Sequence, residues 1–204
     1  MVDIVFNPAT KKVSFNEETL CNLDPSTREE ASQAAVLVNT LMSELVAVNG
    51  EVPPAPNVIT KNVSVSAAKL VGNASKCLQS GKPEDAIKLL STALEMVLRR
   101  PLWEATMLTL DEVCRCLSPR CDAYLTLKKW PEAYADISML MLLKPDDPHN
   151  YFRKGVILFN SGKREEGKEF LRSAQTAAPH ITLFKAVLEQ SEKPESREIQ
   201  ITSK

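Results

Sequence analysis

The sequence predicts a mainly α-helical protein: a three-repeat helical solenoid with a capping helix, preceded by a small N-terminal β-hairpin plus helix arm. Three observations support this fold class. Only six glycines occur in 204 residues, too few for the many tight turns of an all-β protein. Leu, Ala, Lys and Glu, which favour helix, are abundant. A short motif also recurs three times in the second half of the chain, which is typical of a repeat architecture.

Residues 1–48 form the predicted arm. Two runs of alternating apolar residues, separated by a turn signal, predict a two-stranded hairpin. They are Val2, Ile4 and Phe6, then the turn Asn7-Pro8, then Val13 and Phe15. Such a hairpin is marginally stable by itself in water, so it needs a cover. Ser26-Thr27-Arg28-Glu29 predicts a capping box that begins a helix.

An apolar stripe runs along this helix with helical spacing. It consists of Ala34, Val38, Leu41, Leu45 and Val48. A hairpin and one helix are too small to enclose a core of their own. Either the arm folds back on the rest of the chain, or a partner subunit completes it, and we favour the partner. The expected partner-subunit contacts are Val2, Ile4, Phe6, Val38, Leu41 and Leu45.

Residues 49–62 are a Pro-rich linker. Gly50 is followed by Pro53-Pro54-Ala55-Pro56, a composition that favours an extended, semi-rigid spacer. We therefore place a domain boundary here.

The repeated motif lies in residues 63–191. Its three copies are Gly81–Ile87, Lys128–Tyr134 and Gly162–Lys168. The equivalent small residues Ala86, Ala133 and Gly167 are separated by 47 and 34 residues. The second spacing is the period of the tetratricopeptide repeat (TPR), and the first is that period with an insertion. The insertion, Trp103–Leu117, is expected to lengthen the first helix of repeat 2.

Other positions follow the same frame. Twelve residues before each small residue lie Ala74, Cys121 and Gly155, all small enough for two helices to approach closely. Prolines then end the second helices of repeats 2 and 3. An amphipathic helix over Ile181–Leu188 caps the stack, since the last repeat would otherwise expose an apolar face. Residues 192–204 are expected to be a flexible polar tail.

Charge and hydropathy exclude several classes of function. Lys plus Arg is 25 and Asp plus Glu is 26, which argues against a nucleic-acid binder driven by overall positive charge. The longest apolar run, Ile137–Leu143, is far shorter than the ~20 residues of a membrane span. The N-terminus lacks the basic and apolar regions of a signal peptide. We expect any membrane association to occur through a partner, without direct insertion.

Five cysteines, an odd number, lie in amphipathic segments. This pattern favours free, mostly buried thiols in a reducing compartment. Cys114, Cys116 and Cys121 lack the paired spacing of a zinc site. We expect no metal, no cofactor and no catalytic residue.

The repeats identify a TPR domain, and the layout narrows the resemblance further. The hairpin-like N-terminus, the Pro-rich linker and the stretch Arg100–Ala105 resemble the small soluble TPR subunit of the fungal post-translational translocation complex of the endoplasmic reticulum, the Sec72-like proteins. The resemblance implies a non-enzymatic adaptor, peripheral on the cytosolic face of that membrane. It also implies two partners: a membrane-anchored sister subunit, and the acidic C-terminal tail of cytosolic seventy-kilodalton heat-shock chaperones.

Chaperone-tail TPR domains hold terminal carboxylates with Lys, Asn and Arg on the first helix of each repeat, since charged donors bind carboxylates best. Carried onto this sequence, the pattern gives His149 and Arg153 in repeat 3. Repeat 2 departs from it, because Pro119, followed by Arg120, stands where an Asn is needed. Asp122 is expected on the same side, where it could pair with Arg153.

Repeat 1 leaves two readings open. In frame, the two positions hold Val71 and Ser75, whereas Lys69 and Asn73 match the motif but shift the helix phase. The candidate tail-binding residues are therefore Arg153, His149, Asn73, Lys69, Arg120 and Ser75.

Other functions remain open at this level. The same fold would suit a soluble TPR co-chaperone or an import receptor for another organelle. Arg120, Arg153 and Lys154 could also form a solvated helix face. An enzyme has no support, because the sequence has no catalytic triad pattern, phosphate loop or metal spacing.

Overall fold

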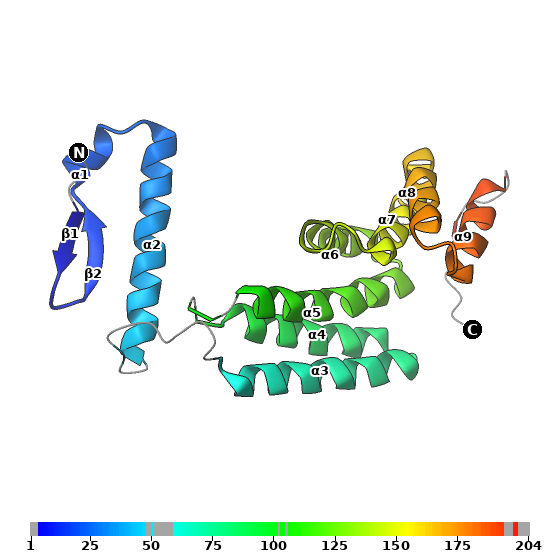
Figure 1. Cartoon of the computed structure of the whole chain (residues 1–204), viewed down its shortest axis with the longest axis horizontal. Coiled ribbons are helices and arrows are strands. Elements are labelled where there is room, and N and C mark those ends of the chain that lie inside the picture. Colours follow the sequence, from blue (N-terminus) through cyan, green and yellow to red (C-terminus); the bar gives the residue numbers. More distant parts are fainter. Residues whose placement is uncertain are drawn as a thin grey trace. The chain divides into compact units, whose positions relative to one another are not determined.

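The computed structural model describes residues 4–47, 50, 59–101, 103–104, 106–193 and 198–199. The chain divides into two compact units. The first consists of Met1–Ile59 and Pro101–Ala105, and the second of Thr60–Arg100 and Thr106–Lys204. Figure 1 shows the elements of both units. Of the sequence predictions, the contact assigned to Val2 lies outside the described residues.

The N-terminal unit contains the predicted hairpin. Strands β1 (Ile4–Asn7) and β2 (Lys12–Phe15) are antiparallel, with Phe6 opposite Val13. At the turn, the side chain of Asn7 accepts hydrogen bonds from the backbone N–H groups of Ala9 and Thr10, at 3.0 and 3.1 Å. A short helix, α1 (Glu17–Cys21), then leads into α2 (Pro25–Ala47). The sequence analysis did not predict α1.

The predicted capping box at Ser26 is wrong. The side chain of Asp24 caps α2 instead, because its Oδ1 accepts a hydrogen bond of 3.0 Å from the backbone N–H of Thr27. Pro25 is the first residue of the helix. Proline favours this first position, because its fixed φ suits a helix and its missing N–H needs no partner there. Asp24 and Ser26 are both good capping residues, and Pro25 places the cap at Asp24.

Helix α2 covers the hairpin through one amide side chain. Asn39 Oδ1 accepts from the backbone N–H of Val13 at 2.7 Å, and Asn39 Nδ2 donates to the carbonyl of Val13 at 2.9 Å. The amide thus pairs with the outer edge of β2 as a further strand would. A two-stranded hairpin needs such support.

The second unit is a stack of three antiparallel helix pairs and a final helix. This confirms the predicted three-repeat TPR solenoid with its capping helix. The pairs are α3 (Lys61–Gln79) with α4 (Pro83–Leu98), α5 (Thr106–Thr126) with α6 (Trp130–Leu143), and α7 (Pro148–Asn160) with α8 (Arg164–Ala177); α9 (Thr182–Glu192) follows. Helix α5 has 21 residues against 13 in α7, as the insertion predicts, although it begins at Thr106 and not at Trp103.

Small residues lie where the two helices of each repeat cross. The buried pairs are Ala74 with Ala86, Cys121 with Ala133, and Gly155 with Gly167. The third pair allows the closest approach. A Cβ atom added to Gly167 would lie 2.6 Å from the backbone nitrogen of Phe159, so only glycine fits. The recurrence of small residues in the sequence therefore reflects a steric requirement of the fold.

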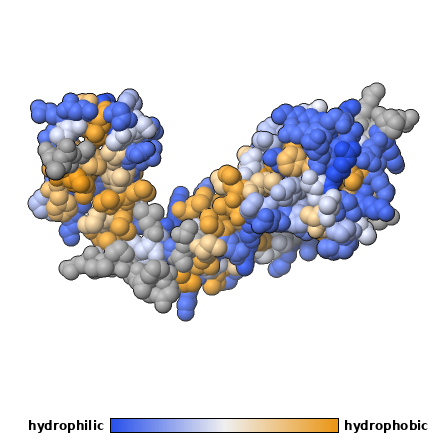
Figure 2. All heavy atoms as spheres, turned by 45° about the horizontal axis from the view of Figure 1, so that its top comes forward, coloured by the Kyte–Doolittle hydropathy of each residue, from blue (hydrophilic) through white to orange (hydrophobic). Residues whose placement is uncertain are grey.

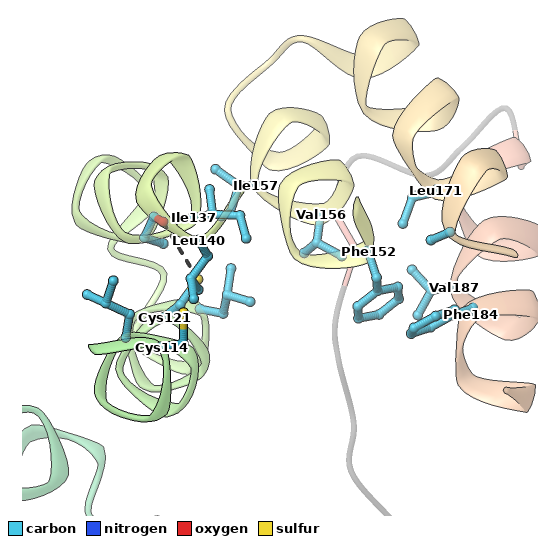
Figure 3. Close-up of a cluster of buried hydrophobic side chains, with 14 of the residues drawn as sticks. Cys114, Cys121, Ile137, Leu140, Phe152, Val156, Ile157, Leu171, Phe184 and Val187 are labelled. Atoms are coloured by element: carbon cyan, nitrogen blue, oxygen red, sulfur yellow. Dashed lines mark hydrogen bonds between the residues drawn. The ribbon is translucent and has the colours of Figure 1, made fainter. Parts of the chain in front are cut away.

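The larger of two core clusters in this unit takes buried residues from every helix from α3 to α9, and a smaller cluster lies between α3 and α4. Figure 3 shows the part of the larger cluster between α5 and α9. Cys114 and Cys121 of α5 lie with Ile137 and Leu140 of α6. Farther along the stack, Phe152 of α7 stacks on Phe184 of α9, with ring centroids 4.6 Å apart. The capping helix thus buries the last apolar face of the solenoid, as solenoid ends require.

The structure describes four residues of the predicted flexible tail over 192–204, which are Glu192, Lys193, Glu198 and Ile199, and the last two contradict the expectation. Ile199 is buried and joins the core of the second unit. The Glu198 carboxylate forms an ion pair with Lys128. The prediction rested on the polar composition of the segment and missed that Ile199 packs into the core.

Candidate peptide-binding face

Arg153 and Asp122 form a bidentate ion pair between α7 and α5. Arg153 Nε lies 2.7 Å from Asp122 Oδ1, and Arg153 Nη2 lies 2.8 Å from Asp122 Oδ2. The pairing expected from the sequence is confirmed. The Arg153 side chain is 14% exposed and the Asp122 side chain 48%. We call the surface of Asp122, His149 and Arg153 the clamp face.

The electrostatic environment keeps Arg153 charged. Burial disfavours the guanidinium cation, but the hydrogen bond that Arg153 donates to Asp122 and nearby negative charge outweigh burial and raise the pKa of Arg153. A charged, mostly buried guanidinium is a strong carboxylate donor with a planar, two-pronged geometry. Asp122 occupies that donor from within the chain.

His149 lies one turn before Arg153, in the first turn of α7. Its side chain is exposed, and its ring packs edge-on against Phe184 at a centroid distance of 5.2 Å. Residues four apart share one face of a helix. His149 and Arg153 therefore present an imidazole N–H and a guanidinium on the same side of α7.

Arg120 binds other side chains of the helical scaffold. Its guanidinium binds Asp136 of α6 at 2.6 and 2.9 Å and donates to Ser91 Oγ of α4 at 3.0 Å. The hydrogen bond to Asp136 is the main cause that raises the pKa of Arg120. Arg120 thus ties α4, α5 and α6 together.

Helix α3 has the phase of the in-frame reading. Ala74 is fully buried against α4, so Ser75 stands at the repeat position that Asp122 holds in α5. Ser75 is partly buried, and its hydroxyl donates to the carbonyl of Val71 at 3.1 Å. Lys69 and Asn73 are exposed. Which of these side chains meets a ligand stays a prediction.

Two translocation subunits resemble this chain over most of its length. The chain is 31% identical over 131 residues to the ER protein translocation subcomplex subunit sec67 of Schizosaccharomyces pombe, a match that covers 64% of this chain and 67% of that protein. It is 28% identical over 189 residues to Translocation protein SEC72 of Saccharomyces cerevisiae, over 92% and 93% of the two chains. The chain belongs to the SEC72/sec67 family of endoplasmic-reticulum translocation subunits. No model of a known protein family matches it.

Solved structures agree with this family and with the fold. A chain in the Sec complex of S. cerevisiae matches with a TM-score of 0.67 and 27% identity, over 93% of this chain and 95% of that one. The second TPR domain of human RPAP3, solved in complex with the HSP70 peptide SGPTIEEVD, matches with a TM-score of 0.51 and 19% identity, over 64% and 98%. The latter likeness concerns the TPR fold alone.

The arm of this SEC72/sec67-family chain exposes apolar side chains, which Figure 2 shows gathered on the N-terminal unit. Of the predicted partner contacts, Ile4, Phe6 and Val38 are exposed, Leu41 is partly buried and Leu45 is buried. The sequence analysis missed three exposed residues of α2 outside the 3.6-residue stripe. They are Val36, Leu37 and Val46.

Neither a membrane span nor a metal cluster occurs in the described part of this family member. No helix there is both long and apolar enough to cross a bilayer. No three His, Cys, Asp or Glu side chains there gather as metal ligands. Burial raises the pKa of the Cys116 thiol to about 11 and that of Cys121 to about 12, so both stay protonated at neutral pH.

Proposed function

We propose that this protein is a non-enzymatic adaptor in post-translational protein translocation, peripheral on the cytosolic face of the endoplasmic reticulum membrane. Its TPR domain receives the acidic C-terminal tail of a cytosolic seventy-kilodalton heat-shock chaperone. Its N-terminal arm docks a membrane-anchored sister subunit. The single observation that carries the proposal is the bidentate Arg153–Asp122 pair, in which a positioned guanidinium already holds a carboxylate.

The family supports the adaptor role in the proposal, and the TPR fold, shared with RPAP3, is one that can hold a peptide. The related chain is part of the Sec complex, so an adaptor role at a translocation channel agrees with the family. The RPAP3 TPR domain binds a peptide that ends in Glu-Glu-Val-Asp. A peptide of this kind carries two carboxylates on its last residue, the group for which a guanidinium is the best-matched side chain.

Binding proceeds by exchange of carboxylates at Arg153. Asp122 is half-exposed, so its side chain can turn into solvent when a ligand carboxylate takes its place. The net free energy of binding is only the difference between the ligand's contact with Arg153 and the Asp122 contact that it replaces. We therefore expect this TPR domain to bind the tail weakly. His149 supplies a second donor one turn away. Lys69, Asn73 and Ser75 are the candidates on α3, whereas Arg120 serves the scaffold.

The outer edge of β1 is the docking edge that we assign to the sister subunit. Asn39 covers the outer edge of β2, and the described sheet has only the two strands in the order β1-β2. Ile4 and Phe6 of β1 are exposed. A strand of the partner added to β1 would pair with its backbone and cover these side chains, which is the β-augmentation mode of binding.

Fluorescence anisotropy with labelled SGPTIEEVD tests the tail-binding function on the full chain. We expect Arg153→Ala to lower the affinity at least tenfold, which corresponds to about 1.4 kcal/mol. Arg115→Ala is the matched control, because Arg115 is an exposed arginine of α5 whose ion pair among the described residues is with Asp111 of the same helix. The same peptide with an amidated C-terminus is the second control. Equal binding of the acid and the amide would refute the carboxylate clamp.

A further inference from the structure

Asn160, the last residue of α7, holds the backbone of Ile199. Asn160 Nδ2 donates to the carbonyl of Ile199 at 3.1 Å, and Asn160 Oδ1 accepts from the backbone N–H of Ile199 at 2.8 Å. Ile199 is 2% exposed. The preceding Glu198 forms a 2.6 Å ion pair with Lys128. An extended dipeptide is thus bound through its backbone, its apolar side chain and its acidic side chain.

The amide–backbone contact is a strand-pairing device. Asn39 holds Val13 of β2 with the same pair of hydrogen bonds, at 2.7 and 2.9 Å. Val13 lies in a β-strand, so this amide geometry recognises extended backbone. Backbone recognition accepts many side chains, while a buried pocket for alternate side chains gives selectivity. Asn160 therefore provides a peptide subsite, and Ile199 and Glu198 show which dyad it accepts.

Lys128 indicates that the acidic part of this dyad is selected. It has a φ of 57°, in the left-handed region. The equivalent turns of repeats 1 and 3 use Gly81 and Gly162, with φ of 71° and 95°, because glycine adopts this conformation without steric cost. Repeat 2 alone carries a side chain there, and that side chain is the cation that binds Glu198.

The subsite is continuous with the clamp face. Asn160 follows Arg153 by seven residues, which places both on one side of α7, about 10 Å apart along the helix axis. An extended peptide covers that length with about three residues. Lys128 is the second residue after the end of α5, the helix of Asp122. A peptide anchored at Arg153 therefore reaches the place that Ile199 occupies.

We propose that Glu198–Ile199 is a resident pseudo-ligand: it occupies a second peptide subsite of the TPR domain, made by Asn160 and Lys128, which takes an extended segment with an acidic residue followed by a β-branched aliphatic residue. This inference rests on the proposed function in one respect, that an incoming acidic tail is the competitor. SGPTIEEVD contains such a dyad, Glu-Val, directly before its last residue. Because Arg153 lies about three residues of extended chain away, one tail either fills the subsite with this dyad or binds Arg153 with its terminal carboxylates, and it displaces the internal dyad in the first case.

The first experiment examines the subsite without any chaperone peptide. Full-length wild type, Ile199→Asp, and the double variant Ile199→Asp with Asn160→Asp are titrated against a labelled peptide of the chain's own sequence, PESREIQITSK. We expect Ile199→Asp, whose tail is released, to bind at least tenfold more tightly than wild type. Asn160→Asp should abolish the gain, since a carboxylate accepts from an N–H but cannot donate to a carbonyl. The matched probe PESRIEQITSK, with the dyad inverted, should bind at least tenfold more weakly.

Amide hydrogen exchange shows whether the variants keep the fold of α7. In wild type the Ile199 amide should exchange slowly, and in Asn160→Asp rapidly, while the amides of α7 keep their protection. Equal binding of PESREIQITSK to wild type and Ile199→Asp, or unchanged exchange at Ile199 in Asn160→Asp, overturns the subsite.

The second experiment uses SGPTIEEVD on the same proteins. We expect at least fivefold tighter binding to Ile199→Asp than to wild type. Equal binding to both overturns the pseudo-ligand role and leaves the proposed function standing. If PESREIQITSK binds Ile199→Asp but SGPTIEEVD binds no variant, the proposed function fails, competition with an acidic tail fails with it, and the subsite stands by itself.

Discussion

The carboxylate of Asp122 binds both Nε and Nη2 of Arg153 from the neighbouring repeat, at 2.7 and 2.8 Å. The clamp face of this SEC72/sec67-family chain is thus self-occupied. An arginine that must bind a ligand carboxylate gains most when no internal carboxylate competes. The pair links α5 to α7, and for the proposed tail binding we expect it to limit the affinity of the face.

Asp122→Asn should increase the affinity of the full chain for SGPTIEEVD about three- to tenfold. The amide keeps a hydrogen bond to Arg153 but removes the competing negative charge. Because Asp122 is half-exposed, the ion pair contributes little to folding, and we expect a stability loss of about 0.5–1 kcal/mol. Anisotropy titration and urea unfolding measure the two effects.

The salt dependence provides the control for Asp122→Asn. Screening weakens exposed charge pairs, so the advantage of the variant should shrink between low and high ionic strength. An affinity that is unchanged by Asp122→Asn at any salt concentration would contradict competition at Arg153.

Gly167→Ala should destabilise the second unit by about 1–3 kcal/mol. Its Cβ would lie 2.6 Å from the backbone nitrogen of Phe159 and 2.8 Å from the carbonyl oxygen of Gly155, and backbone atoms cannot turn aside. Gly72→Ala is the matched control, because a Cβ at Gly72 meets nothing within 4 Å. That helical position should gain about 0.5–1 kcal/mol. Thermal unfolding of both variants checks the opposite signs.

The repeat architecture could be predicted from the sequence because its steric rule is local and periodic. Crossing positions such as Ala86, Ala133 and Gly167 must be small in every repeat, so a small residue recurs in the sequence once per repeat. The capping helix follows from the same argument, since an end of a solenoid must be covered. The pairing of Asp122 with Arg153 could be foreseen because the repeat frame aligns the helices that carry them.

Contacts that join unrelated parts of the chain could not be predicted in this way. Asn39 binds Val13 across 26 residues, and Asn160 binds Ile199 across 39, and no periodic pattern marks either asparagine. The charge of Arg120 is visible in the sequence, but its partner Asp136 depends on how α5 packs on α6. A polar side chain is assigned to a ligand or to the scaffold only when its neighbours are known.

The buried thiols should make the protein less stable above pH 9. The ordinary pKa of a cysteine here is 9.0, and burial raises that of Cys121 to about 12 and that of Cys116 to about 11. Between pH 9 and these values the unfolded chain loses thiol protons that the folded chain keeps. Unfolding then releases protons, so stability falls as pH rises through this window. Denaturant unfolding from pH 8 to pH 11 measures the slope.

Cys121→Ala is the test of that assignment. Alanine fits, because repeat 1 has Ala74 at the same position, and the stability loss at pH 7 should stay near 1 kcal/mol. The slope above pH 9 should become shallower. A thiol reagent at pH 7 should label the exposed Cys21 rapidly and Cys114, Cys116 and Cys121 only on unfolding. An unchanged alkaline slope in Cys121→Ala would argue against this thiol as its source.

Arg100→Met should be the most destabilising of these substitutions, by about 3–5 kcal/mol. The Arg100 side chain is 2% exposed and binds Glu112 of α5 at 2.7 Å, and it also donates to Ser64 of α3 at 2.6 Å. Without Arg100, the Glu112 carboxylate stays buried but loses that cation. The free-energy cost of burying the negative charge is then no longer offset by the ion pair. Adding Glu112→Leu should therefore restore part of the loss. If the double variant is less stable than Arg100→Met, the cost lies in lost packing, and charge burial is not its cause.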